Sequence, residues 1–82
     1  MSKAITKVRE ELEYCIVDVQ QKRPYTYVRV EIAYSDNEIC EEIAFTKASY
    51  PDRWNADYGV ELAIDKALAD FARAVVRGGN NG

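Results

Sequence analysis

The apolar residues of this chain are three or four positions apart before Pro24 and two apart after it, and this change restricts the fold most. The first stripe alternates with charged residues in the pattern of an amphipathic helix, and it consists of Ile5, Val8, Leu12, Cys15, Ile16 and Val19. We therefore expect a helix over residues 3 to 20, capped by Ser2. Because proline removes a backbone donor and keeps the preceding residue extended, this helix should end near Lys22.

From Tyr25 the period of two predicts a strand that reaches about Tyr34. The segment 35–38 is typical of a tight turn, because Asp and Asn tolerate left-handed backbone angles. A second strand is expected from Ile39 to about Lys47. The two strands should form an antiparallel hairpin.

A two-residue loop in this hairpin would place Val30 opposite Ile43 and Val28 opposite Phe45, on the face expected to cover the core. Glu41 is the polar exception on that face, so we expect it to be the carboxylate with a perturbed pKa. A three-residue loop with a bulge would shift the whole pairing, and this alternative stays open.

The other face of the hairpin is less polar than a solvated face usually is, so we expect it to contact a protein partner. In the same register Glu31 and Glu42 lie opposite each other, which is unfavourable unless Arg29 is diagonal to them. Tyr25 and Tyr27 belong to this face as well. Tyr25, Tyr27, Arg29, Glu31 and Glu42 form the predicted partner-binding surface. The alternative is that the acidic residues are only solvated. The hairpin also has open edges, so we expect a homo-oligomer.

A second helical stripe follows an irregular segment, and it consists of Val60, Ile64, Ala67, Leu68, Phe71, Ala74 and Val75. Asn55 or Asp57 can cap this helix, and Gly78 with Gly79 should end it. Before it, a short third strand ending at Tyr50 is conceivable.

This order of elements predicts an α+β fold. The fold consists of an N-terminal helix, an antiparallel β-hairpin or three-stranded sheet, and a C-terminal helix, with the helices on one face. A single domain over residues 1–78 and a disordered tail at 79–82 are expected.

Composition excludes several function classes. The 82 residues, 48% hydrophobic and 30% charged, make one globular domain. The chain has no histidine, so the usual general base and zinc ligand are missing, and we expect neither an enzyme nor a cofactor. A formal charge of −3 gives no global attraction to nucleic acid or anionic membranes. Without an apolar leader or a membrane-spanning run, a cytoplasmic location is expected.

Two cysteines are too few for a disulfide scaffold, so reduced thiols are expected. Cys15 belongs to the first apolar stripe and should be buried and inert. Cys40 has no neighbour that would stabilise a thiolate, so we do not expect it to act as a nucleophile.

A ligand site is conceivable where the last helix begins. Trp54 and Tyr58 are four residues apart with Arg53 beside them, so rings, a cation and helix amides could hold a nucleotide or another planar anion. Arg53 or Arg73 would neutralise the phosphate, and a dimer interface would complete the pocket. The alternative is that Trp54 only fills the core.

A weaker nucleic-acid surface is conceivable near Pro24. Lys22 and Arg23 precede Tyr25 and Tyr27, and this mixture of basic and aromatic residues occurs on single-strand-binding surfaces. Solvated basic side chains are the simpler interpretation.

The segment from Pro51 to Leu68 resembles a pattern in small phage-encoded accessory proteins. In that pattern a hairpin precedes proline, aspartate and an aromatic residue, then glycine, then a helix opening with Leu-Ala-Ile-x-Lys-Ala-Leu, here residues 62–68. The order of elements is also similar to double-stranded-RNA-binding folds, although the basic Lys-Lys-x-Ala-Lys start of their helix is absent.

Some of these phage proteins are counter-defence factors. Inhibitors of Thoeris-type immunity sequester a cyclic ADP-ribose signal, and anti-CRISPR proteins block host nucleoproteins. The resemblance implies a non-enzymatic protein that binds a host defence protein stoichiometrically, as an anti-CRISPR-like inhibitor does. Sequestration of a small nucleotide signal of the cyclic ADP-ribose type is the first alternative, and a nucleic-acid-binding module is the second.

Overall fold

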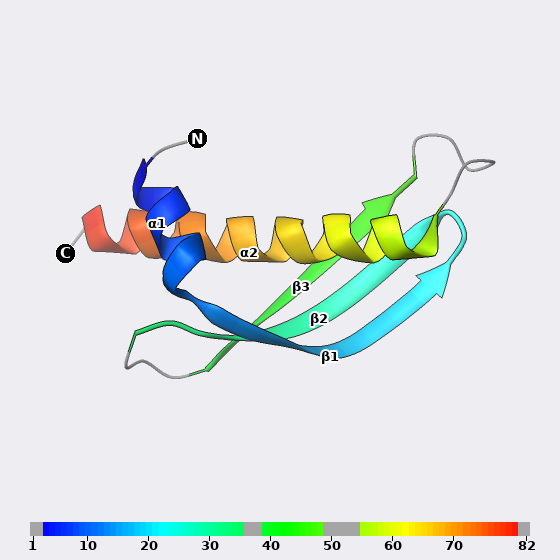
Figure 1. Ribbon diagram of the computed structural model, residues 1–82, viewed down its shortest axis with the longest axis horizontal. Helices are drawn as coiled ribbons and strands as arrows, with labels where there is room; N and C mark the ends of the chain where they lie inside the picture. The colour runs from blue at the N-terminus through cyan, green and yellow to red at the C-terminus, as the bar shows by residue number, and fades with distance from the viewer. Residues whose placement is uncertain (1–2, 36–38, 49–54, 81–82) are drawn as a thin grey trace.

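The chain is organised as one helix, three strands and a second helix in a computed structural model that describes residues 3–35, 39–48 and 55–80 (Figure 1). The elements are α1 (Lys3–Glu11), β1 (Glu13–Lys22), β2 (Tyr25–Ala33), β3 (Cys40–Lys47) and α2 (Ala56–Asn80). The strands form an antiparallel sheet in the order β1-β2-β3. Both helices lie on the same side of this sheet. The predicted α+β arrangement is confirmed, with a three-stranded sheet.

The predicted first helix is wrong beyond Glu11. The helix ends there, Leu12 is buried at the junction, and residues Glu13–Lys22 form β1. The β-branched and aromatic residues of this segment favour an extended chain. The helix therefore ends well before the predicted end near Lys22. What ends at Lys22 is strand β1, and Arg23 and Pro24 form the turn into β2.

A bulge in β1 explains why its sequence imitates a helix. The pairing with β2 passes from Ile16 opposite Val30 to Asp18 opposite Arg29, so Val17 is an extra residue. A bulge shifts the alternation of side chains by one position. Ile16 and Val19 therefore lie on the same face although they are three residues apart, a spacing that also fits an α-helix.

The register of β2 and β3 also differs from the prediction by one residue. Val28 lies opposite Ala44 and Val30 opposite Glu42. A shift of one residue moves every side chain of a strand to the other face. Ala44 is therefore buried under α2, while Ile43 and Phe45 point away from the helix.

The core lies between the sheet and α2. Val28, Val30 and Ile32 of β2 have no exposed surface, and they pack with an alanine-rich seam of α2 that includes Ala63 and Ala67. Small side chains let a helix approach a sheet closely. The other members of the core cluster are Val8, Leu12, Ala44, Leu68, Phe71 and Ala72.

Helix α2 begins at the cap that the sequence offers first. The Tyr58 amide donates to Asn55 Oδ1 at 3.0 Å, and the Gly59 amide donates to the Asn55 carbonyl at 2.9 Å. Asn55 is thus the N-cap. The helix continues through Gly78 to Asn80, past the predicted end, and Gly78 has ordinary helical geometry.

Helix α1 packs against α2. Arg9 forms an ion pair with Asp65, and Val8 joins the core. The rings of Tyr34 and Phe71 meet edge to face, with centroids 6.1 Å apart.

Among the described residues, no helix is long and apolar enough to cross a membrane. The predicted Ser2 cap, the strand ending at Tyr50 and the last two residues of the predicted tail lie outside the described residues.

Candidate interaction surface

The sheet has one face turned away from α2, and we call it the open face. Side chains alternate along β2, so the residues between its buried positions point outward. The pairing of the strands then defines the members of the open face: Glu13, Cys15, Asp18, Gln20, Lys22, Tyr25, Tyr27, Arg29, Glu31, Ala33, Glu41, Ile43, Phe45 and Lys47.

One end of the open face is aromatic and apolar. Tyr27 lies opposite Phe45, with ring centroids 5.0 Å apart and planes tilted by 51°. The exposed fractions of Tyr25, Ile43 and Phe45 are 50%, 47% and 59%. Large rings are rarely this exposed together on a monomer unless they bind something.

Two lysines flank the aromatic end. Lys22 lies opposite Tyr25 in one strand pair and Lys47 lies opposite it in the other. The Lys47 Nζ is 5.8 Å from the centroid of the Tyr25 ring, within the range of a cation–π contact. A shallow hollow of about 310 Å³ adjoins these rings, lined by Gln20, Gln21, Lys22, Tyr25, Tyr27 and Phe45.

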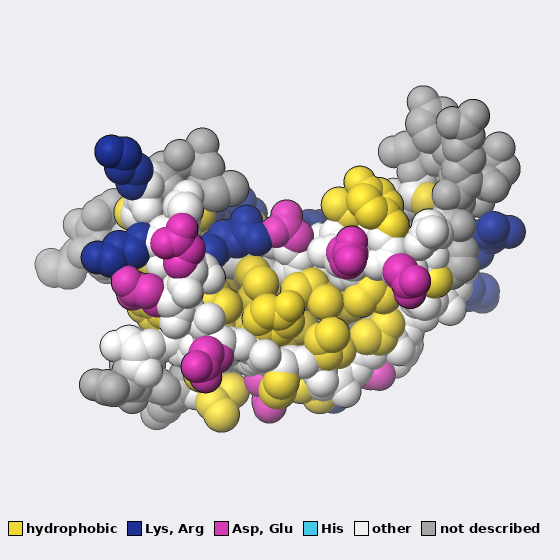
Figure 2. Space-filling model, viewed as in Figure 1, with side chains coloured by type: hydrophobic (Ala, Val, Ile, Leu, Met, Phe, Trp, Pro, Cys, Tyr) yellow, Lys and Arg dark blue, Asp and Glu magenta, His cyan; other side chains and the backbone are white. Residues whose placement is uncertain are grey.

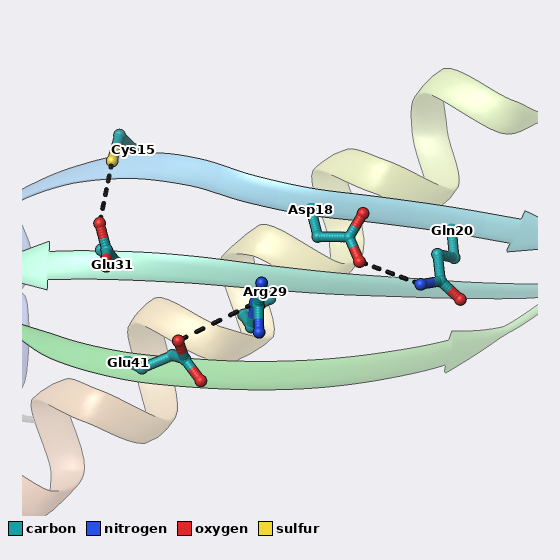
Figure 3. A network of polar contacts seen from close by, with 6 residues as sticks. All are labelled: Cys15, Asp18, Gln20, Arg29, Glu31 and Glu41. Carbon is teal, nitrogen blue, oxygen red and sulfur yellow. Dashed lines mark hydrogen bonds and ion pairs between the residues drawn. The ribbon is translucent and has the colours of Figure 1, made fainter.

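The other end of the open face is charged, and Figure 3 views it with α2 behind the sheet. Arg29 Nε lies 3.9 Å from Glu41 Oε2, and Asp18 lies opposite Arg29 in the neighbouring strand. The Arg29 Nε is buried and makes no hydrogen bond to any described residue. The Cys15 thiol donates a long contact of 3.9 Å to Glu31 Oε1. The carboxylates of Asp18, Glu31 and Glu41 thus share this end with the Arg29 guanidinium.

A second polar contact keeps Asp18 in place at this end. The Gln20 side-chain amide donates to Asp18 Oδ2 at 3.0 Å (Figure 3). The open face therefore has a charge gradient, from the lysines beside Tyr25 to the carboxylates around Arg29.

Four of the five predicted partner-binding residues lie together on the open face: Tyr25, Tyr27, Arg29 and Glu31. Glu42 does not, because the register shift places it under α2, half-buried and opposite Val30. Burial raises the pKa of Glu42 above its ordinary value of 4.5, and the nearby Asp70 carboxylate adds to the rise. The perturbed carboxylate is thus Glu42, whereas the sequence pattern had indicated Glu41.

Sequence reasoning missed the contribution of β3 to the open face. Ile43 and Phe45 were assigned to the core, and Glu41 with them. The missing information was the register. Glu31 lies opposite Glu41 and not opposite Glu42 as expected, and Arg29 pairs with Glu41. Cys15 was also expected in the core and is exposed.

The predicted nucleotide site is not assembled within the described residues. Arg53 and Trp54 lie outside them. Tyr58 is exposed in the first turn of α2, and Arg73 forms an ion pair with Asp70. Fifteen residues of helix separate Tyr58 from Arg73, which is about 22 Å along the axis and more than one nucleotide spans.

Neither a metal site nor similarity to known proteins adds a functional role to this surface. In the part of the chain that the structure describes, no group of three potential ligands could hold a metal ion. Comparisons with protein-family models, with curated proteins and with solved structures find no match to this chain.

Proposed function

We propose that this protein acts without catalysis, by stoichiometric binding of a protein partner on the open face of its sheet. The partner that we propose is a host defence protein in the host-cell cytoplasm, bound by a phage-encoded counter-defence factor. The resemblance of residues 51–68 to phage accessory proteins supports the setting. The exposed aromatic end of the open face supports the mode of action, and it is the observation on which the proposal rests.

The composition of the open face fits a protein contact. Tyrosine, phenylalanine and arginine are enriched where protein interfaces bind most strongly, and Tyr25, Phe45 and Arg29 supply all three. The charge gradient across the face would give orientation to the complex, because complementary charges select the docking geometry. The two edge strands of the sheet support the further proposal that the protein acts as a homo-oligomer.

Affinity capture from a lysate of a defended bacterial host tests the proposal. We expect one host defence protein to be retained in a stoichiometric amount by the wild-type chain. Phe45→Ser should weaken this binding at least about tenfold, as truncation of a central aromatic anchor does. Unchanged thermal unfolding would show that the variant remains folded.

Tyr58→Ser is a matched control, because Tyr58 is 60% exposed, like Phe45, but lies on α2. This variant should retain the partner fully. Loss of binding in Tyr58→Ser but not in Phe45→Ser would refute the open face as the contact surface and would favour a site at the start of α2.

Single-stranded nucleic acid is a second candidate ligand for the same face. The observation that favours it is Tyr25 between Lys22 and Lys47, with the Tyr27 and Phe45 rings beside it. Rings that stack on bases and lysines that follow phosphates are the usual elements of such a platform. Titration with an oligouridine at low salt tests this candidate, which fails if Tyr25→Ser binds as well as the wild type.

A further inference from the structure

Strand β1 is a long edge strand whose apolar side chains are only partly covered. Within the part of the chain that the structure describes, it pairs with β2 alone. Tyr14, Ile16 and Val19 lie on the helix side of the sheet, yet they are 47%, 46% and 38% exposed. Figure 2 shows the resulting band of hydrophobic side chains between α2 and β1. An edge of this length and composition favours pairing with another strand.

The opposite edge of the sheet is protected. Helix α2 packs over β3, and the Lys66 Nζ donates to the backbone carbonyl of Phe45 at 3.1 Å. A helix that covers an edge strand, with a charged side chain at a strand carbonyl, is an obstacle to further pairing. The two edges therefore differ, and β1 is the one open to a new strand.

The bulge gives β1 an unusual symmetry. A regular strand of ten residues could not pair over its full length with an antiparallel copy related by a two-fold axis. Odd-numbered residues would lie opposite even-numbered ones, whose side chains point to the other face of the sheet. Because Val17 is an extra residue, the helix-side positions are Tyr14 and Ile16 before it and Val19 and Gln21 after it. The bulge thus makes full-length self-pairing possible.

We propose that two copies of this chain associate through antiparallel pairing of β1 with β1, centred between Val17 and Asp18. In this register Ile16 lies opposite Val19 of the second copy, so the two apolar rows join. Glu13 lies opposite Lys22 of the second copy, and the symmetry creates this attractive pair twice. A continuous six-stranded sheet results. The proposal rests on the self-association proposed above and specifies its surface.

The register makes a native thiol into a probe. Cys15 lies opposite Gln20 of the second copy, on the open face, at a Cα separation of about 4.5–5.5 Å. This separation permits a disulfide. Within one chain the same two positions are about 16 Å apart along the strand, so a disulfide between them must join two copies.

The test combines Gln20→Cys with Cys40→Ser, so that the chain carries two thiols. With oxidised glutathione as the oxidant, we expect nearly complete conversion to a covalent dimer with two disulfides. The control is Gln21→Cys in the same background, because position 21 points to the helix side and should give little dimer. Equal crosslinking of both variants, or crosslinking of the control alone, would overturn the register.

Sedimentation equilibrium of the unmodified chain at high micromolar concentration provides the second measurement. We expect the mass of two chains, and the mass of one chain would overturn the proposal, since a bulge can also turn an edge away from partners. Glu13→Lys should weaken the dimer roughly tenfold, because two attractive pairs become repulsive. Adding Lys22→Glu should restore it, and a double variant as weak as the single one would contradict the pairing.

These results separate the two proposals. The dimer surface and the aromatic end of the open face have different central residues, Ile16 with Val19 in one case and Phe45 in the other. A dimer that captures no host protein would refute the proposed partner and leave the β1 pairing intact. A monomer that still captures the partner would refute the β1 pairing and leave the proposed partner intact.

Discussion

The two faces of the sheet are built from alternate residues of the same strands and have opposite fates. On the covered face, Val28, Val30 and Ile32 have no exposed surface, while on the open face Ile43 and Phe45 are about half exposed. Residue type does not separate the faces, because both carry large apolar side chains. The exposure of their side chains differs because α2 covers only one of the two faces. An apolar side chain therefore stabilises the fold on one face and remains available for contact on the other.

The largest expected effect comes from removing the same side chain from each face. Ile32→Ala should lower the free energy of unfolding by about 3 kcal/mol, because it leaves a cavity under α2. Ile43→Ala should cost less than about 1 kcal/mol, since its side chain is 47% exposed. Chemical denaturation of both variants measures this difference, and equal losses would show that the open face is buried in solution.

A buried hydroxyl gives the next effect. Thr26 is 1% exposed, and its Oγ1 has no hydrogen-bond partner among the described residues. Thr46 opposite it donates to the Gly59 carbonyl at 3.4 Å. Thr26→Val should therefore stabilise the fold by about 1 kcal/mol, because it removes an unpaired polar group from the core. Thr46→Val should not stabilise it. Thermal unfolding compares the two, and a destabilised Thr26→Val would contradict the assignment.

The smallest effect concerns the neighbouring glutamates of β3, which point to different faces. Because burial raises the pKa of Glu42 in the folded chain, its charged form destabilises the fold as the pH rises through that pKa. Glu42→Gln should thus stabilise the chain by roughly 0.5 kcal/mol at neutral pH. The gain should vanish below the ordinary value of 4.5, where both states bind the proton.

Glu41→Gln is the control for this comparison, because Glu41 faces outward and pairs with Arg29. It should give no gain at neutral pH. Unfolding curves recorded across the acidic pH range measure the gain in stability of both variants. A gain in Glu42→Gln that is independent of pH would argue against burial as its cause.

The parts of the fold that the sequence predicts are those with one dominant pattern. In β2 every second residue is buried, so its period of two identifies a strand and its faces. In α2 the apolar stripe at Ile64, Leu68 and Phe71 identifies a helix, and Asn55 supplies its cap. Here local preference and tertiary packing agree, which is the condition for a reliable prediction.

The failures have two local causes. In β1 the extra residue Val17 changes the phase of the alternation, and a strand with a shifted phase resembles a helix in its apolar spacing. In β3 both faces carry apolar residues, so hydrophobicity could not select the register. Packing selects it instead, because the seam of small residues on α2 leaves room for Ala44 and not for Phe45. The four predicted surface residues of β2, Tyr25, Tyr27, Arg29 and Glu31, are unaffected by this error, because the prediction for their own strand was correct.

The alternation of β2 also has a consequence for how such a protein can change over generations. Its even positions from Thr26 to Ile32 hold the core, and its odd positions from Tyr25 to Glu31 form the surface. Substitutions at sites without shared contacts have nearly additive effects on stability. Variation at the odd positions can therefore change the chemistry of the exposed surface while the fold stays the same. Under the proposed binding function, a lineage could follow a changing target by substitutions along a single strand.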